Sequence, residues 1–167
     1  MANAILYNAL AWTINGSSLY SSNVASWINT WFLANDTYMN PNLNYAQVVR
    51  GPTTYKTGTH TGVLDLKCMV KILSAVLVLR GGNAPEWTSE IDSGLVTWTK
   101  SYIGWLTNNT LALQEAAATK CVTFNPMPLP SSDGLVIPCV QCADNLSLFT
   151  AITGRSIIVS LRRCKSS

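Results

Sequence analysis

The chain has 167 residues, of which 48% are hydrophobic and only 11% are charged. This length predicts a single domain, and this composition excludes disorder of the charge-rich kind. The longest apolar run, residues 75–79, is far shorter than the roughly 20 residues that a membrane-spanning helix needs, so we expect no membrane segment. Residues 1–7 lack the pattern of a signal peptide, which leaves an intracellular protein or a missing N-terminal segment.

The net charge of +3 lies entirely in the C-terminal part of the sequence. Residues 1–119 hold six basic and six acidic side chains, whereas residues 120–167 hold five basic and two acidic ones. No helical or strand pattern gathers the basic side chains beside aromatic residues. A nucleic-acid partner is therefore not expected, because such proteins carry a clustered basic face.

Other residue types change near residue 120 as well. All six Trp and all six Tyr lie before Thr119, while four of the five Cys and four of the seven Pro lie after it. We therefore expect a well-patterned domain over residues 1–119 and an unrelated, irregular tail of low order over residues 120–167.

The tail holds a lone Cys-x-x-Cys pair, Cys139 and Cys142. A zinc ribbon needs a second such pair, and a redox motif needs a strand followed by a helix. A metal or redox protein remains an alternative, but incidental thiols are the favoured interpretation. No cofactor and no metal are expected.

Four segments before the change in composition carry helix signals. Apolar residues recur at spacings of three and four, and turn residues stop each run. The predicted helices cover residues 2–12, the low 20s to the mid-30s with Ser21 or Ser22 as cap, residues 61–80 and residues 85–108.

These paired amphipathic helices predict an all-α fold, either a bundle or a helical toroid. Trp27, Trp87 and Trp98 fall on the apolar stripes of the predicted helices, so we expect them in the core. A platform for a sugar ring is the alternative for such a stripe.

The stretch between residues 35 and 60 is long, polar and rich in turn residues, and loops of this length are often functional. Its amides, phenol, guanidinium and the chain's single imidazole suit the hydroxyls and carboxylate of an acidic sugar. The competing interpretation is that Asn and Pro form turns and that His60 caps the next helix. The candidate sugar-binding residues are Asn44, Tyr45, Gln47, Arg50 and His60.

Several pieces of the sequence, in order, resemble the alginate lyase domain family and in particular its fungal secreted members. They are residues 4–12 (AILYNALAW), 39–47 (MNPNLNYAQ), 58–65 (GTHTGVLD), 98–102 (WTKSY) and 111–116 (LALQEA). The resemblance covers residues 1–119 and then stops.

The resemblance implies part of an (α/α) toroid of paired antiparallel helices that binds an acidic polysaccharide, a uronan. It also implies cleavage by β-elimination: the carboxylate is neutralised, the C5 proton is removed and the leaving glycosidic oxygen is protonated. In the family an Asn-Asn-His motif supplies the neutralising pair and a downstream Tyr is the usual acid and base. No redox cofactor is required.

The Asn-Asn-His motif is expected directly after Thr119, but Lys120, Cys121 and Val122 stand there. We therefore expect an incomplete and catalytically impaired lyase, with no catalytic residue assigned and with a tail that comes from a retained intron or a shifted reading frame. A non-catalytic carbohydrate-binding or helical interaction module is the alternative.

The sequence also favours an extracellular parent protein. Asn-x-Ser/Thr triplets, the acceptor form for N-glycosylation, begin at Asn15, Asn35, Asn108 and Asn145. On this interpretation the missing signal peptide belongs to a missing N-terminal segment.

Overall fold

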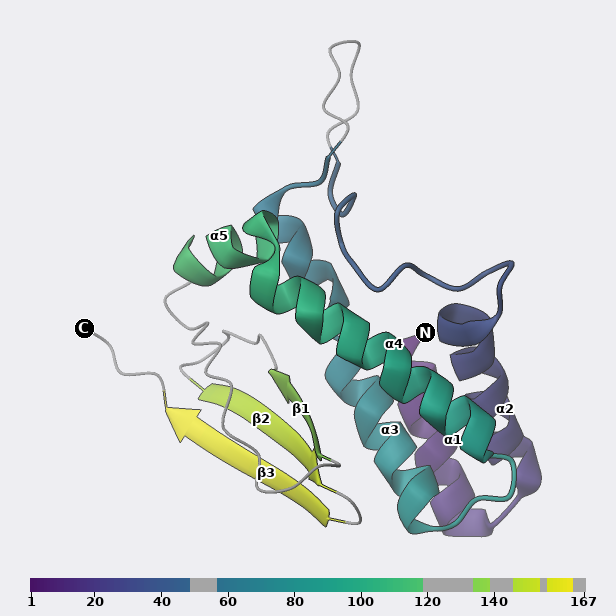
Figure 1. The fold of residues 1–167 in the computed structure, drawn as a ribbon. Coiled ribbons are helices and arrows are strands. Elements are labelled where there is room, and N and C mark those ends of the chain that lie inside the picture. Colours follow the sequence, from purple (N-terminus) through teal and green to yellow (C-terminus); the bar gives the residue numbers. More distant parts are fainter. Residues whose placement is uncertain (49–56, 119–133, 139–145, 154–155, 164–167) are drawn as a thin grey trace. The chain divides into compact units, whose positions relative to one another are not determined.

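The computed structural model describes residues 1–48, 57–118, 134–138, 146–153 and 156–163 (Figure 1). It divides into two compact units. The first unit comprises Met1–Pro41 and Cys68–Ser101, and the second comprises Asn42–Lys67 and Tyr102–Ser167. Arg50 and the cysteine pair of the tail lie outside the described residues.

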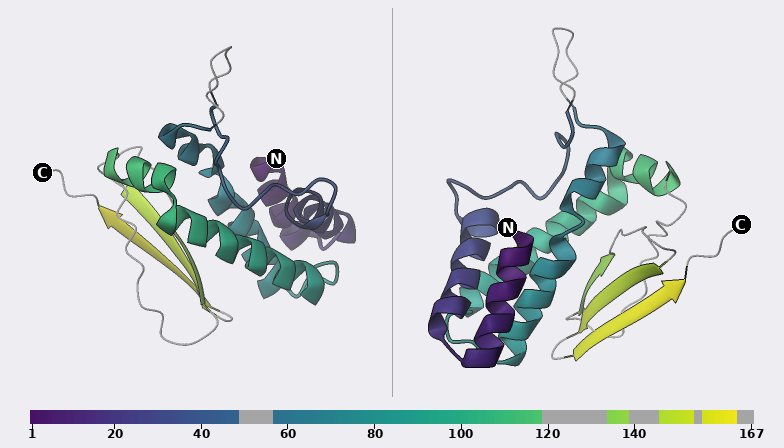
Figure 2. Two further views of the ribbon diagram at one scale, coloured as in Figure 1. Left: turned by 45° about the horizontal axis from the view of Figure 1, so that its top comes forward. Right: turned by 180° about the vertical axis from the view of Figure 1, so that it is seen from behind.

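The first unit is built around helix α1, Ala2–Asn15, which packs against both α2, Ser18–Ile28, and α3, Met69–Gly81 (Figure 2). Gly16 ends α1 with a left-handed conformation, φ 70°, that costs glycine little and allows a tight turn into α2. The α1 and α2 helices are therefore antiparallel neighbours, as predicted.

Helix α3 runs parallel to α1. Near the start of both helices, Lys71 Nζ donates a hydrogen bond to Asn3 Oδ1 over 2.8 Å. Near the end of both, Gly82 lies so close to Trp12 that an added Cβ would collide with the indole ring. Six of the thirteen residues of α3 are buried and only Lys71 and Gly81 are exposed, which agrees with its apolar sequence.

The α2 helix continues into a short π-helix, Asn29–Leu33, and helix α4 covers Ser89–Asn108. Phe32 meets the buried Trp98 edge-to-face, with ring centroids 4.8 Å apart. The indole N–H of Trp98 donates to the backbone oxygen of Met39 over 2.7 Å. These contacts bring the start of the long loop against α4 within the first unit.

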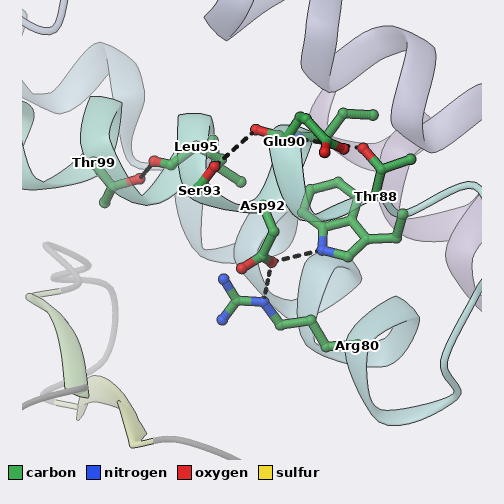
Figure 3. A network of polar contacts seen from close by, with 9 residues as sticks. Arg80, Thr88, Glu90, Asp92, Ser93, Leu95 and Thr99 are labelled. Atoms are coloured by element: carbon green, nitrogen blue, oxygen red, sulfur yellow. Dashed lines mark hydrogen bonds and ion pairs between the residues drawn. The ribbon is translucent and has the colours of Figure 1, made fainter.

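A polar network fixes the N-terminal turn of α4 to the end of α3 (Figure 3). The carboxylate of Asp92 accepts hydrogen bonds from Arg80 Nε over 2.5 Å and from Trp87 Nε1 over 2.6 Å. An acidic side chain is also favoured here because the helix dipole places partial positive charge at this end.

The second unit contains a 3₁₀-helix, His60–Leu66, which packs against α5, Thr110–Ala118, together with the last turns of α4. The single helix predicted over residues 61–80 is therefore divided into this 3₁₀-helix and α3. The sequence prediction also did not include α5 as a separate helix. Asn109 caps it, since its Oδ1 accepts the backbone N–H of Leu111 over 2.9 Å.

Three antiparallel strands follow in the tail, β1 Gly134–Pro138, β2 Leu146–Thr153 and β3 Ser156–Arg163, in the order β1-β2-β3. Leu135 pairs with Ile152 and Ile158 pairs with Ala151. The sequence analysis expected an irregular tail and did not predict these strands. They contain four Ile, two Val and two Thr, and only two residues separate β2 from β3, which is a hairpin spacing.

The helical class predicted for residues 1–119 is confirmed in the described part of that segment. Trp98 is buried as predicted, Trp87 is half-buried, and Trp27 is exposed, so the core prediction for Trp27 is wrong. The predicted cap is also wrong, because Ser21 is buried inside α2 and donates to Glu86, while Ser17 precedes the helix. No helix in the described residues is long and apolar enough to cross a membrane.

Candidate functional site

The candidate site lies in the second unit, where residues 42–47 run against residues 58–62. The Gly58 amide donates to the Asn44 carbonyl over 2.5 Å, and the Thr59 amide donates to the Ala46 carbonyl over 3.1 Å. A Cβ on either Gly58 or Gly62 would collide with the backbone of Ala46. The absence of a side chain at these two positions is therefore what allows the two segments to approach.

Asn44 is held by two groups from the helices. Its Oδ1 accepts a hydrogen bond from Trp105 Nε1 over 2.7 Å and another from Asn109 Nδ2 over 3.3 Å. Both oxygen lone pairs are thus engaged, and the side-chain amide nitrogen is the end of Asn44 that remains to donate elsewhere. Trp105 and Asn109 were not among the predicted site residues.

Gln47 is exposed and is held in a specific orientation. Its Nε2 donates to Asp65 Oδ1 over 2.8 Å, while its Oε1 accepts from Thr61 Oγ1 over 3.0 Å. Because an ionised carboxylate only accepts, Asp65 determines which end of the amide faces it. The Gln47 backbone has φ 52°, a left-handed conformation that costs a non-glycine residue free energy and is common at binding sites.

His60 forms a close pair with Glu115. Its Nδ1 lies 2.7 Å from Glu115 Oε2, and the exposed fractions of the two side chains are 44% and 5%. The packing of the 3₁₀-helix on α5 brings together these residues, which are 55 positions apart in the sequence. His60 begins the 3₁₀-helix rather than capping it, since Thr59 occupies the cap position.

The structure therefore anchors three of the five candidate residues, Asn44, Gln47 and His60, in one unit through their side chains. Tyr45 lies between two of them in the sequence and is 66% exposed, so its phenol is available at the surface. Arg50 falls outside the described residues, and its position at the site stays a prediction.

The last turns of α4 contribute a pair of aromatic side chains, Tyr102 and Trp105, to this unit. The rings of Tyr102 and Trp105 are stacked, with centroids 6.1 Å apart and planes 12° apart. Burial raises the pKa of the Tyr102 phenol well above its ordinary value, so this group stays protonated under ordinary conditions.

In residues 1–48 and 57–118, no three His, Cys, Asp or Glu side chains gather in a way that could hold a metal ion.

The family comparison covers the whole of this site. The family model described as "Alginate lyase" matches residues 1–123, which includes every described residue of both helical units. The chain belongs to the alginate lyase family. The resemblance on which the sequence prediction rested is therefore confirmed.

A solved structure shares the fold of this alginate lyase family member. The crystal structure of an alginate lyase from Bacteroides ovatus at 1.60 Å resolution aligns with a TM-score of 0.65 and 24% sequence identity. The alignment covers 71% of this chain and 30% of the Bacteroides protein, so the chain spans less than a third of that protein's length. No curated protein matches the chain.

Proposed function

We propose that this protein is an extracellular, polysaccharide lyase-like protein that binds an acidic polysaccharide built of uronic acids. The observation that carries this proposal is the polar site formed by residues 44–47 and 58–61, which lies inside the region matched by the alginate lyase family. Amide donors, an imidazole and an exposed phenol together can hydrogen-bond sugar hydroxyls and ring oxygens. In addition, Arg50 can pair with a uronate carboxylate through its guanidinium fork.

The reaction that the family resemblance implies is β-elimination, but we propose that this chain performs it poorly. The Asn-Asn-His motif expected after Thr119 is absent, and the chain's single histidine, His60, follows Gly58 and Thr59. Without the motif, the charge that develops on the uronate when the C5 proton leaves has lost its main stabilising donors. We therefore assign no catalytic residue to the elimination step.

The alternative is a non-catalytic carbohydrate-binding module. The orientation of Gln47 by Asp65 and Thr61 favours this candidate specifically, because the two contacts hold a hydrogen-bonding amide in one orientation, as binding requires. A module of this kind binds uronans and leaves no unsaturated chain ends.

Two assays on the intact chain separate these functions. Calorimetry with oligomers of alginate and glucuronan measures binding, and the ultraviolet absorbance of the unsaturated uronide measures elimination. We expect binding with little or no product. Rapid product formation would contradict catalytic impairment and support an active lyase, and the failure of every uronan to bind would contradict the proposed function itself.

We further propose that residues 120–167 come from a retained intron or a shifted reading frame. The change in composition and the loss of the expected motif coincide at this position, and each was observed independently of the other. Sequencing the transcript from the native source tests the idea. An uninterrupted message together with intact protein of this sequence would contradict it.

The extracellular location has its own support. Asn15, Asn35 and Asn108, which begin three of the four glycosylation triplets, are all exposed. We expect a mass shift on treatment of the secreted native protein with a glycosidase specific for N-linked glycans.

A further inference from the structure

The pair of His60 and Glu115 combines one accessible and one buried side chain. The imidazole is 44% exposed, whereas the carboxylate is 5% exposed and meets Nδ1 at 2.7 Å. The ring therefore presents one nitrogen to the interior of the unit and has its remaining edge accessible. Lyase chemistry as described above assigns no task to Glu115.

We propose that Glu115 is a positioning residue that holds the proton of the neutral His60 ring on Nδ1, so that the Nε2 lone pair faces the bound sugar. An ionised carboxylate can only accept a hydrogen bond, and a neutral imidazole carries one donor and one acceptor. At 2.7 Å the Nδ1 atom must then be the donor, which leaves Nε2 as the acceptor. The identity of the ligand, a uronan, rests on the proposed function, whereas the choice of tautomer does not.

This arrangement determines which part of a uronic acid residue His60 can recognise. An Nε2 lone pair accepts the hydrogen of a sugar hydroxyl and repels a carboxylate. Carboxylate recognition then falls to other donors of the described site, such as the second N–H of Gln47. His60 thereby contributes selectivity for hydroxyl position rather than for charge.

The composition of the chain makes the tautomer directly measurable. His60 is the only histidine, so every imidazole signal in a ¹⁵N nuclear magnetic resonance spectrum belongs to it without assignment. The spectrum is recorded at mildly alkaline pH, because the protonated and unprotonated nitrogens of a neutral ring give well-separated signals. Free histidine favours the opposite tautomer, with the proton on Nε2, so the expected result differs from the default.

We expect the intact wild-type chain to show a protonated Nδ1 and an unprotonated Nε2. Glu115→Leu keeps much of the side-chain volume but removes the acceptor for Nδ1–H, and it should shift most of the population to the Nε2–H tautomer that free histidine favours. Glu90→Leu, which changes a carboxylate on the exposed surface of α4, is the matched control and should leave the His60 spectrum unchanged.

Each outcome bears on the proposal. An Nε2–H tautomer in the wild type overturns it, and so does an Nδ1–H tautomer that persists in Glu115→Leu. If the variant does not fold, the wild-type spectrum alone still decides between the two tautomers. Addition of oligomannuronate to the wild type should move the Nε2 signal and keep the Nδ1–H form. An Nδ1–H ring that does not respond to an oligouronate that binds in calorimetry would support the pairing with Glu115 but overturn its sugar-facing role. Failure of every oligouronate to bind in calorimetry would instead overturn the proposed function.

Discussion

Trp105 Nε1 donates a hydrogen bond to Asn44 Oδ1 over 2.7 Å, and this contact joins the last turns of α4 to the loop that carries the candidate sugar-binding residues. The loop has no regular secondary structure at this point, so this side-chain contact acts together with the backbone hydrogen bonds from Gly58 and Thr59 to fix its position. A helix therefore positions the irregular segment that carries the candidate residues, and such ordering before binding lowers the conformational entropy that a ligand must overcome.

Trp105→Phe should weaken both folding and binding. Phenylalanine retains the aromatic ring beside Tyr102 but removes the indole N–H, and we expect a loss of about 1 kcal/mol in the free energy of unfolding, measured in urea. Affinity for oligouronates should fall by about threefold to tenfold in calorimetry, because the loop must then be ordered on binding.

The matched control for this variant is Trp87→Phe. It also removes one indole donor, the one to Asp92, but it lies in the first unit. It should lower stability by at least as much and leave affinity for oligouronates unchanged. Equal losses of affinity in the two variants would show that Trp105 acts through general stability and not through Asn44.

Gly62→Ala should disrupt the candidate site more strongly than any change of a polar side chain. The new Cβ would lie 2.5 Å from the carbonyl oxygen of Ala46 and 2.8 Å from its Cβ, so the two segments of the site would have to separate. We expect a loss of about 1–3 kcal/mol in unfolding free energy, together with loss of uronan binding.

Gly104→Ala is the control for the previous substitution. It adds the same methyl group inside α4 in the same unit, where nothing lies within 4 Å of the new Cβ. It should stabilise the protein by about 0.5–1 kcal/mol because alanine loses less backbone entropy in a helix than glycine does. If Gly62→Ala also stabilised the protein and preserved binding, residues 44–47 could not pack as described.

The parts of the fold that the sequence predicts are those fixed by short spacings. The stripe of apolar residues in α4 and the glycine that ends α1 are local features, and both agree with the structure. Trp27 could not be placed in the same way. A residue on an apolar stripe is buried only if another element covers it, and its spacing alone does not reveal that element.

The candidate site shows the same limit more clearly. Its loop was found from composition, but the partner of His60 is 55 residues away and depends on how α5 packs. One signal for Glu115 was available: it lies three positions after the buried Ala112, on the inward face of a short helix, where a charged residue normally has a specific partner. The contact of Asn109 with Asn44 could not be predicted from the sequence. An asparagine at the start of α5 is already explained as a helix cap, so its residue type gives no sign of the second contact.

Tyr102→Phe should change how stability depends on alkaline pH. Burial raises the pKa of Tyr102 in the folded state above its unfolded value of about 10, so above about pH 10 the unfolded chain loses a proton that the folded chain retains. Stability that is fully present below this pH is then lost as the pH rises toward the folded pKa. For one such group the limiting slope is about 1.4 kcal/mol per pH unit.

The unfolding free energy of the wild type should therefore fall more steeply than that of Tyr102→Phe between about pH 10 and 11. The lysines also titrate in this range, but they are the same in both proteins, so their contribution cancels in the comparison. Tyr45→Phe, which removes a phenol that is 66% exposed, is the control and should follow the wild-type slope. Urea unfolding at several pH values measures the slopes, and tyrosinate absorbance reports ionisation directly. If the unfolding free energies of the wild type and Tyr102→Phe fell in parallel with pH, the Tyr102 phenol would be accessible to water in the folded protein. The last turns of α4 would then not be packed as the stacked pair of Tyr102 and Trp105 requires.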